Sequence, residues 1–69
     1  MEDFNLENKE FVELSDLLKV TGMCESGGMA KIVITEGNVK VDGKVETRRR
    51  CKIRKGQIVT AQGREVRIA

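Results

Sequence analysis

Residues 26–43 read Ser-Gly-Gly-Met-Ala-Lys-Ile-Val-Ile-Thr-Glu-Gly-Asn-Val-Lys-Val-Asp-Gly, and their pattern changes from helical to extended partway along. Ser26 is a suitable N-cap, because its hydroxyl can accept a hydrogen bond from a free backbone N–H of the first turn. One helical stripe then holds four apolar residues: Met29, Ala30, Val33 and Ile34. Gly37 follows where the end of a helix commonly needs a left-handed residue. The stretch predicts a helix that starts after Ser26 and stops before Gly37.

The end of the same stretch predicts a hairpin. Val39 and Val41 alternate with polar residues, as in a half-buried strand. Asp42-Gly43 is a strong signal for a tight turn. Residues 44–45 should then return as a second strand.

Two glycines, Gly27 and Gly28, stand in the first turn of the predicted helix. Each costs about 0.5–1 kcal/mol relative to alanine inside a helix. They leave the first-turn amides uncovered at the positive end of the helix dipole, which suits a phosphate. The alternative is that they let the start of the helix pack closely against a neighbouring element. The residues alone leave both explanations open.

The N-terminal half predicts a second helix near residues 13–20, from apolar residues at helical spacing: Phe11, Leu14, Leu17 and Leu18. Three more apolar residues should cover its ends: Val12, Val20 and Met23. Since the link to the Ser26 helix is short, the two helices should form a compact hairpin. Residues 1–10 are an acidic N-terminal arm, in which Phe4 and Leu6 alternate. This arm is either a short edge strand or a frayed end.

The C-terminal third predicts short strands. If residues 50–54 are extended, Cys51 and Ile53 point inward and the basic residues between them point outward, with a bend at Arg49. Further strands begin at Ile58 and include residues 66–68, joined by a Gln62-Gly63 turn. The elements together predict an α+β fold, in which two short helices pack on a small, mainly antiparallel sheet. With 69 residues, the chain should be one domain spanning residues 1–69.

Composition excludes several classes of function. The chain has no His and no Cys-x-x-Cys, so neither the usual general base nor a zinc site is indicated, and we expect no enzyme, metal or cofactor. Phe4 and Phe11 are the only aromatic residues, too few for a protein that stacks single-stranded bases. No basic and apolar leader and no membrane-length apolar run is present. We therefore expect a cytoplasmic protein with free thiols at Cys24 and Cys51.

The charges are unevenly distributed along the chain. Residues 1–25 hold seven acidic and two basic residues, whereas residues 26–69 hold eleven basic and four acidic ones. The densest basic segment has six charges within eight residues: Arg48, Arg49, Arg50, Lys52, Arg54 and Lys55. Guanidinium forks match phosphate oxygens well, so this segment favours a polyanionic partner. The alternative is a solvated basic edge that prevents strand-to-strand aggregation. Glu46 should pair with neighbouring arginines.

A longer pattern runs Leu14-x-x-Leu17-Leu18-x-x-x-Gly22-Met23-x-x-Ser26-x-x-x-Ala30-x-x-x-Ile34-x-x-Gly37-x-Val39-x-Val41-Asp42-Gly43. It resembles the small RNA-binding domain named after ribosomal protein S-four, also called the alpha-L motif, over about residues 12–60. The run of residues 25–31, followed by Val45-Glu46-Thr47-Arg48, is similar to the stand-alone YbcJ-like family, which is bacterial. The resemblance implies two helices against a small curved sheet and binding to RNA.

The resemblance and the charge pattern together give a set of candidate RNA-binding residues. Positions that match the family's recognition surface are Ser26, Lys31, Lys40, Arg48, Arg49 and Arg50. The helix start adds Gly27 and Gly28, and the basic segment adds Lys52, Arg54 and Lys55. Gly27 departs from the family, which mostly has Arg there, so no contact by that side chain is carried over. Gly56-Gln57 also departs from the Gly-Asp of many members, which affects a turn.

We therefore expect a non-catalytic monomer that binds structured RNA, ribosomal RNA or the ribosome being one candidate, through a basic face. Such binding would be led by charge and shape, through phosphates and 2′-hydroxyls. A competing hypothesis is a protein-interaction module that docks a basic partner through its acidic N-terminal half.

Overall fold

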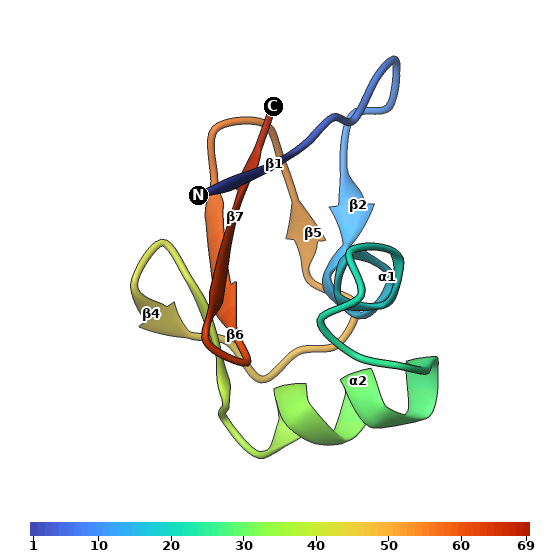
Figure 1. The fold of residues 1–69 in the computed structure, drawn as a ribbon, viewed down its shortest axis with the longest axis vertical. Helices are drawn as coiled ribbons and strands as arrows, with labels where there is room; N and C mark the ends of the chain where they lie inside the picture. The colour runs from blue at the N-terminus through green and yellow to red at the C-terminus, as the bar shows by residue number, and fades with distance from the viewer.

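The computed structural model describes residues 1–69 and contains two helices and seven short strands (Figure 1). In chain order these are β1 (Glu2–Phe4), β2 (Val12–Glu13), α1 (Leu14–Val20), α2 (Gly27–Thr35), β3 (Val39–Val41), β4 (Lys44–Val45), β5 (Lys52–Ile53), β6 (Ile58–Ala61) and β7 (Arg64–Ile68). None of the helices is long and apolar enough to span a bilayer.

A five-stranded sheet forms one side of the protein, in the order β1-β7-β6-β3-β4. Three of its pairings are antiparallel, and β1 pairs with β7 in parallel. The helices and a separate antiparallel ribbon of β2 and β5 lie across the core from this sheet (Figure 1). The α+β class and the mainly antiparallel sheet that the sequence predicts are thus confirmed.

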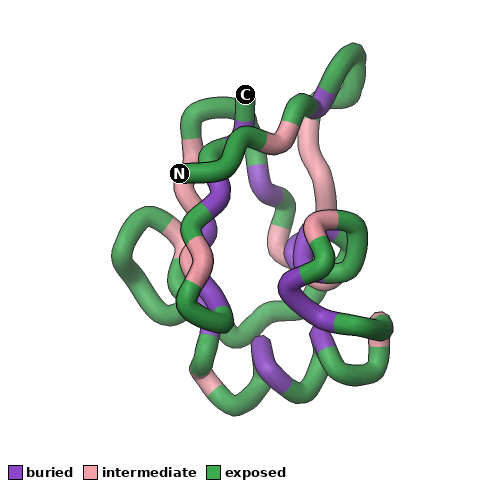
Figure 2. The backbone as a smooth tube through the Cα atoms, in the orientation of Figure 1, coloured by how far each residue is buried: buried purple, intermediate pink, exposed green.

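The core lies between these two layers, and buried segments of the sheet, both helices and β5 face it (Figure 2). The core holds Leu14, Leu17 and Leu18 of α1, Val39 of β3, and the inward residues of β6 and β7, together with Ile53, Ala30, Val33 and Ile34. Val41 of β3 is only half-buried. Two sequence predictions are wrong here. Met29 is 42% exposed, because the inward arc of α2 centres on Ala30 and Ile34, and Val20 is 60% exposed at the last residue of α1.

The turns that the sequence predicts are present. Ser26 accepts a hydrogen bond from the Met29 amide at 3.2 Å, and Gly37 has a φ of 79° just after α2. Asp42 and Gly43 have φ values of 53° and 82°, as a tight hairpin turn with two left-handed central residues requires. Asp42 also accepts a hydrogen bond from the Ile58 amide at 2.9 Å, so its carboxylate has a structural role.

The start of the N-terminal arm forms an edge strand, β1, so the alternative of a frayed end is wrong, but the strand ends at Phe4 and does not reach Leu6. β1 pairs along β7, and the Ala69 amide donates to the Phe4 carbonyl at 2.7 Å. Two acidic residues of the arm, Glu2 and Asp3, form ion pairs with Arg64 and Arg67 of β7. The Arg64 guanidinium also donates to the Thr21 carbonyl at 2.9 Å, which ties the sheet to the end of α1.

Two other predictions need correction. The two helices contact each other, but they do not form the predicted compact hairpin, because they cross: α1 is seen end-on in Figure 1 while α2 runs across the view. Residues 21–26 link the two helices, and two residues of this link, Met23 and Cys24, are buried in the core. The strand predicted at residues 50–54 is only Lys52–Ile53, because residues 49–50 form a turn. That turn confirms the predicted bend at Arg49.

Candidate nucleic-acid interface

The arginine segment is fixed to the start of α1 through its backbone. The Leu14 amide donates to the Cys51 carbonyl at 2.9 Å, and the Ser15 amide donates to the Arg49 carbonyl at 3.0 Å. These are two of the first-turn amides that have no partner inside a helix. Because the main chain of this loop is engaged, the side chains of Arg48, Arg49 and Arg50 are left exposed on the surface.

Glu46 holds Arg48 in place, as the sequence predicts. Its carboxylate accepts hydrogen bonds from Arg48 at the backbone amide (2.9 Å), at Nε (2.9 Å) and at Nη2 (3.1 Å). The Glu46 side chain is 17% exposed, whereas that of Arg48 is 76% exposed. The side-chain hydrogen bonds from Arg48 are the main reason why the pKa of Glu46 falls from 4.5 to about 2. Glu46 therefore stays ionised and anchors the start of the basic segment.

This ion pair gives a pH-dependent prediction. Since the folded pKa of Glu46 lies below its ordinary value, its stabilising contribution is complete above about pH 4.5 and is lost as the pH falls towards 2. Solvent screening at the exposed arginine limits that contribution to about 1 kcal/mol. We expect Glu46→Gln to lower the unfolding free energy at pH 7 by up to this amount and to flatten its decline between pH 5 and pH 2. Urea unfolding at pH 7 and pH 3 measures both. The same decline in variant and wild type would contradict the role of Glu46.

Two adjoining hollows lie beside the arginine loop. The larger has a volume of about 770 Å³ and is lined by Thr35, Thr47 and the residues from Arg48 to Lys52. The smaller has a volume of about 220 Å³ and is lined by Glu13, Ser15, Lys31, Arg49 and Arg50. Arg49 and Arg50 line both hollows, so they stand between the two. The arrangement gives a concave surface with positive charge on several sides.

Helix α2 supplies the other wall of this surface. Lys31 lines the smaller hollow and Thr35 the larger one. These two residues are four apart and therefore share a helix face, as does Gly27 one turn earlier. The start of α2 is thus on the same stripe as Lys31. Glycine at 27 and 28 is not required by packing, since an added Cβ would meet nothing at Gly27 and only Ser26 Oγ, at 3.9 Å, at Gly28.

Two cations of the basic segment, Lys52 of β5 and Arg54 just after it, lie beside an aromatic ring. Lys52 Nζ lies 5.0 Å and Arg54 Cζ lies 5.7 Å from the centroid of the Phe11 ring. A cation over an aromatic face is attracted by the negative charge of that face. Phe11 therefore offsets part of the repulsion between these two cations and holds them in the outward row that the sequence predicts.

The turn after β5 is held by Gln57. Its carboxamide oxygen accepts from the Arg54 amide at 2.8 Å, and its nitrogen donates to Asp42 Oδ2 at 3.2 Å. An aspartate at position 57 would bring a second carboxylate towards Asp42, so glutamine suits this chain. Lys55 is exposed in this turn, at the end of the basic segment.

The cations of the surface differ in how well they are neutralised. Arg48 is paired with Glu46, and Arg50 Nε lies 3.7 Å from Glu13 Oε1, longer than a good hydrogen bond. Five others form no ion pair with the protein: Lys31, Arg49, Lys52, Arg54 and Lys55. Arg64 and Arg67, in contrast, are neutralised by the N-terminal arm. Three of the five unpaired cations, Lys31, Arg49 and Lys52, line the hollows.

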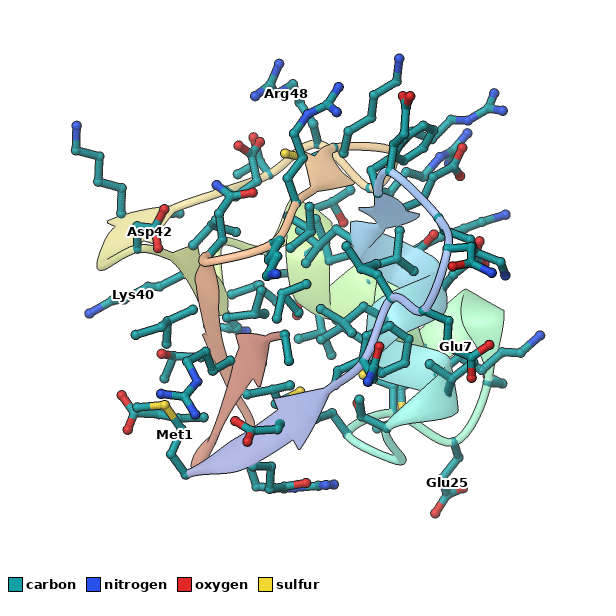
Figure 3. The ribbon with its side chains drawn as sticks, turned by 90° about the horizontal axis from the view of Figure 1, so that it is seen from above. Met1, Glu7, Glu25, Lys40, Asp42 and Arg48 are labelled. Carbon is teal, nitrogen blue, oxygen red and sulfur yellow. The ribbon has the colours of Figure 1, made fainter.

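Other predicted site residues lie apart from the hollows. Lys40 projects from β3 towards a different side of the molecule from Arg48 (Figure 3), and it lines neither hollow. Ser26 uses its hydroxyl to cap α2. The contribution of these residues to binding stays a prediction.

The thiols are both free of disulfides. Cys51 was expected to be a buried core residue, but it is only half-buried and lines the larger hollow beside the arginines. Its pKa is nevertheless raised, mainly by burial and then by the charge of Glu46. Cys24, which was placed in the link between the helices, is 2% exposed and belongs to the core.

Sequence reasoning did not assign to the site five of the residues around this surface: Phe11, Glu13, Ser15, Thr35 and Thr47. Phe11 was predicted on the apolar stripe of the first helix, which is wrong, because it is half-buried and precedes α1. Thr35 could have been found from its spacing of four from Lys31. Thr47 directly precedes the arginine run. The other three are brought to the site by the pairing of β2 with β5 and by the docking of α1, for which the sequence carries no local signal.

Comparisons with known proteins show the family of this chain. The sequence model of the S4 domain matches residues 4–69. The chain is 56% identical over 68 residues to YbcJ of Escherichia coli (strain K12), a protein named for a presumed RNA-binding role, and to an uncharacterized YbcJ protein of Shigella flexneri. Each match covers 99% of this chain and 97% of the relative. The solution structure of YbcJ from E. coli, described as an alpha-L motif involved in RNA-binding, superposes with a TM-score of 0.77 at 55% identity. That match covers 100% of this chain and 87% of the other.

Proposed function

Since the chain belongs to the S4 domain family, in its YbcJ branch, we propose that it binds structured RNA through the concave basic surface between α2 and the arginine loop. The observation that carries the proposal is the pair of adjoining hollows, which gathers Lys31, Arg49, Arg50 and Lys52 from separate parts of the chain. Lys31, Arg49 and Lys52 form no ion pair within the protein, so they suit RNA phosphates, which then supply the missing counter-charge.

The mode of binding follows from what lines the surface. A concave wall of cations and hydroxyls fits the phosphates and 2′-hydroxyls of a folded RNA better than it fits splayed bases. We further propose that the protein is a cytoplasmic monomer without catalytic activity. Ribosomal RNA or the ribosome is one candidate target. The name and description of the E. coli relative support the RNA-binding part of this proposal.

The competing hypothesis, a basic protein partner on the acidic half, is less well supported. Three of its acidic residues, Glu2, Asp3 and Glu13, already lie beside arginines of this chain. Co-purification with and without RNase treatment separates the two hypotheses. RNA binding predicts an excess of nucleic-acid absorbance that RNase removes. A protein partner that stays bound after RNase, with no such absorbance, would favour the competing hypothesis.

The start of α2 gives a separate prediction. Gly28→Ala adds a methyl group where only Ser26 Oγ lies within 4 Å, so we expect no overpacking. The unfolding free energy should rise by about 0.4–1 kcal/mol through the lower entropy of the unfolded chain. If the bare amides hold a phosphate, RNA affinity should fall at the same time, because the methyl group obstructs the anion. Thermal melts beside RNA titrations at two salt concentrations measure both effects. Unchanged affinity in a stable variant would remove this helix start from the interface.

A further inference from the structure

We propose that the smaller hollow recognises ribose, with Glu13 and Ser15 binding a 2′-hydroxyl while Lys31 and Arg49 hold the neighbouring phosphate. The hollow would thereby make the protein prefer RNA to DNA. This inference rests on the proposed function and adds a specificity-determining residue, Glu13, that lies outside the basic segment.

The size of the hollow limits what can enter. Its volume of about 220 Å³ is below the roughly 300–1,000 Å³ of pockets that enclose whole small molecules. It therefore suits one part of a nucleic-acid backbone rather than a complete nucleotide. Three of its five lining residues are cations, which selects a phosphate as the charged part of that ligand.

A carboxylate is unexpected in a phosphate site, and Glu13 is one of the lining residues. Its side chain is 32% exposed and accepts no hydrogen bond from the protein, and its closest cation, Arg50 Nε, lies 3.7 Å away. Glu13 stands at the N-cap position of α1 without capping it, because the Leu14 and Ser15 amides donate to the carbonyls of Cys51 and Arg49 instead. Apart from the long ion pair with Arg50, no contact within the protein uses the Glu13 carboxylate.

The chemistry of an ionised carboxylate identifies the group that it fits. It repels phosphate, and it can only accept hydrogen bonds, so its ligand must be a donor. In RNA a hydroxyl donor lies close to every phosphate, at the ribose 2′ position, and DNA lacks it. The Ser15 hydroxyl, which makes no hydrogen bond within the protein, can donate to or accept from the same group. The 2′-hydroxyl then lies beside Glu13 and Ser15, and the neighbouring phosphate lies beside the cations of the same hollow.

Binding titrations with three versions of one hairpin test the inference: RNA, DNA of the same sequence, and RNA with 2′-O-methyl groups, which cannot donate. Wild type should bind RNA roughly 10- to 100-fold more tightly than the other two, the range expected for one hydrogen bond to a charged group. In Glu13→Ala this preference should fall to near one. RNA should bind more weakly, while DNA and the methylated RNA bind at least as tightly as before because a repulsive charge is gone. Glu10→Ala, which removes an exposed carboxylate outside the hollow, should keep the preference.

Each outcome decides the question. If Glu13→Ala raises the affinity for all three hairpins equally, Glu13 acts only as a charge and the inference is overturned. An equal loss for all three, with a lower melting temperature, would assign Glu13 a structural role and overturn it as well. Wild type that binds RNA and DNA equally would leave the proposed function standing and reject ribose recognition. Wild type that binds none of the hairpins would reject the proposed function itself.

Discussion

Replacing Lys31, Arg49 and Arg50 together by alanine should weaken the binding of structured RNA by roughly 30- to 300-fold near physiological salt, at about 1 kcal/mol per lost contact. These three cations line the smaller hollow, and the two arginines also line the larger one. Each phosphate contact releases counterions, so the slope of log affinity against log salt should shrink by about 0.7–0.9 per contact, or about 2–3 in total. The loss should depend little on base sequence.

This variant leaves the Arg48–Glu46 pair intact, so the loop keeps its anchor. A charge-matched control replaces three exposed lysines that line neither hollow: Lys9, Lys19 and Lys44. Fluorescence anisotropy at four salt concentrations gives affinity and slope for both variants. An equal loss in both would show that only net charge matters, and an unchanged slope in the first would place the binding surface elsewhere.

Truncation of Ile53 should produce the largest loss of stability. Its side chain is fully buried, and its neighbours Lys52 and Arg54 are the cations beside Phe11. Ile53→Ala removes buried methyl groups and leaves a cavity, which costs about 2–5 kcal/mol. A domain of this size has a total stability of about 3–10 kcal/mol, so much of it would be lost. Ile32→Ala makes the same chemical change at a side chain that is 58% exposed and should cost little.

Urea unfolding followed by far-UV circular dichroism measures both isoleucine variants, and this probe suits a chain that has no Trp or Tyr. A cost below 1 kcal/mol at Ile53, or equal costs at Ile53 and Ile32, would contradict the placement of Ile53 in the packed core. If Ile53→Ala is only partly destabilised, its RNA affinity should also fall, since Ile53 lies between two of the unpaired cations, Lys52 and Arg54.

Local patterns predicted those parts of the fold that depend on neighbours in sequence. The cap at Ser26, the left-handed Gly37 and the Asp42-Gly43 turn each follow from a few adjacent residues, and each is present. The apolar stripe of α2 was predicted correctly for Ala30, Val33 and Ile34 but not for Met29, which is exposed. A residue at the edge of a stripe can face either the core or the solvent. The parallel pairing of β1 with β7 joins the two ends of the chain, and no local pattern indicates it.

Some residues of the candidate site could likewise be predicted from the sequence, and others could not. Composition located the basic segment, since six charges within eight residues need a partner. The placement of Lys31 opposite Arg49 and Arg50 depends on backbone hydrogen bonds from α1 to residues 49 and 51, which join distant parts of the chain. For the same reason the sequence could not show that Glu13 faces a cationic hollow, or that Phe11 lies beside Lys52 and Arg54.

The position of the RNA-binding surface is tested most directly by NMR titration of the wild-type protein with a structured RNA hairpin. The backbone amides of residues 31–35 and 47–54 should show the largest shift changes, and these should weaken as salt is added. Lys40 on β3 and the N-terminal arm serve as internal references elsewhere on the molecule (Figure 3). Changes confined to β3 or the arm, or no change at all at low salt, would contradict a binding surface between α2 and the arginine loop.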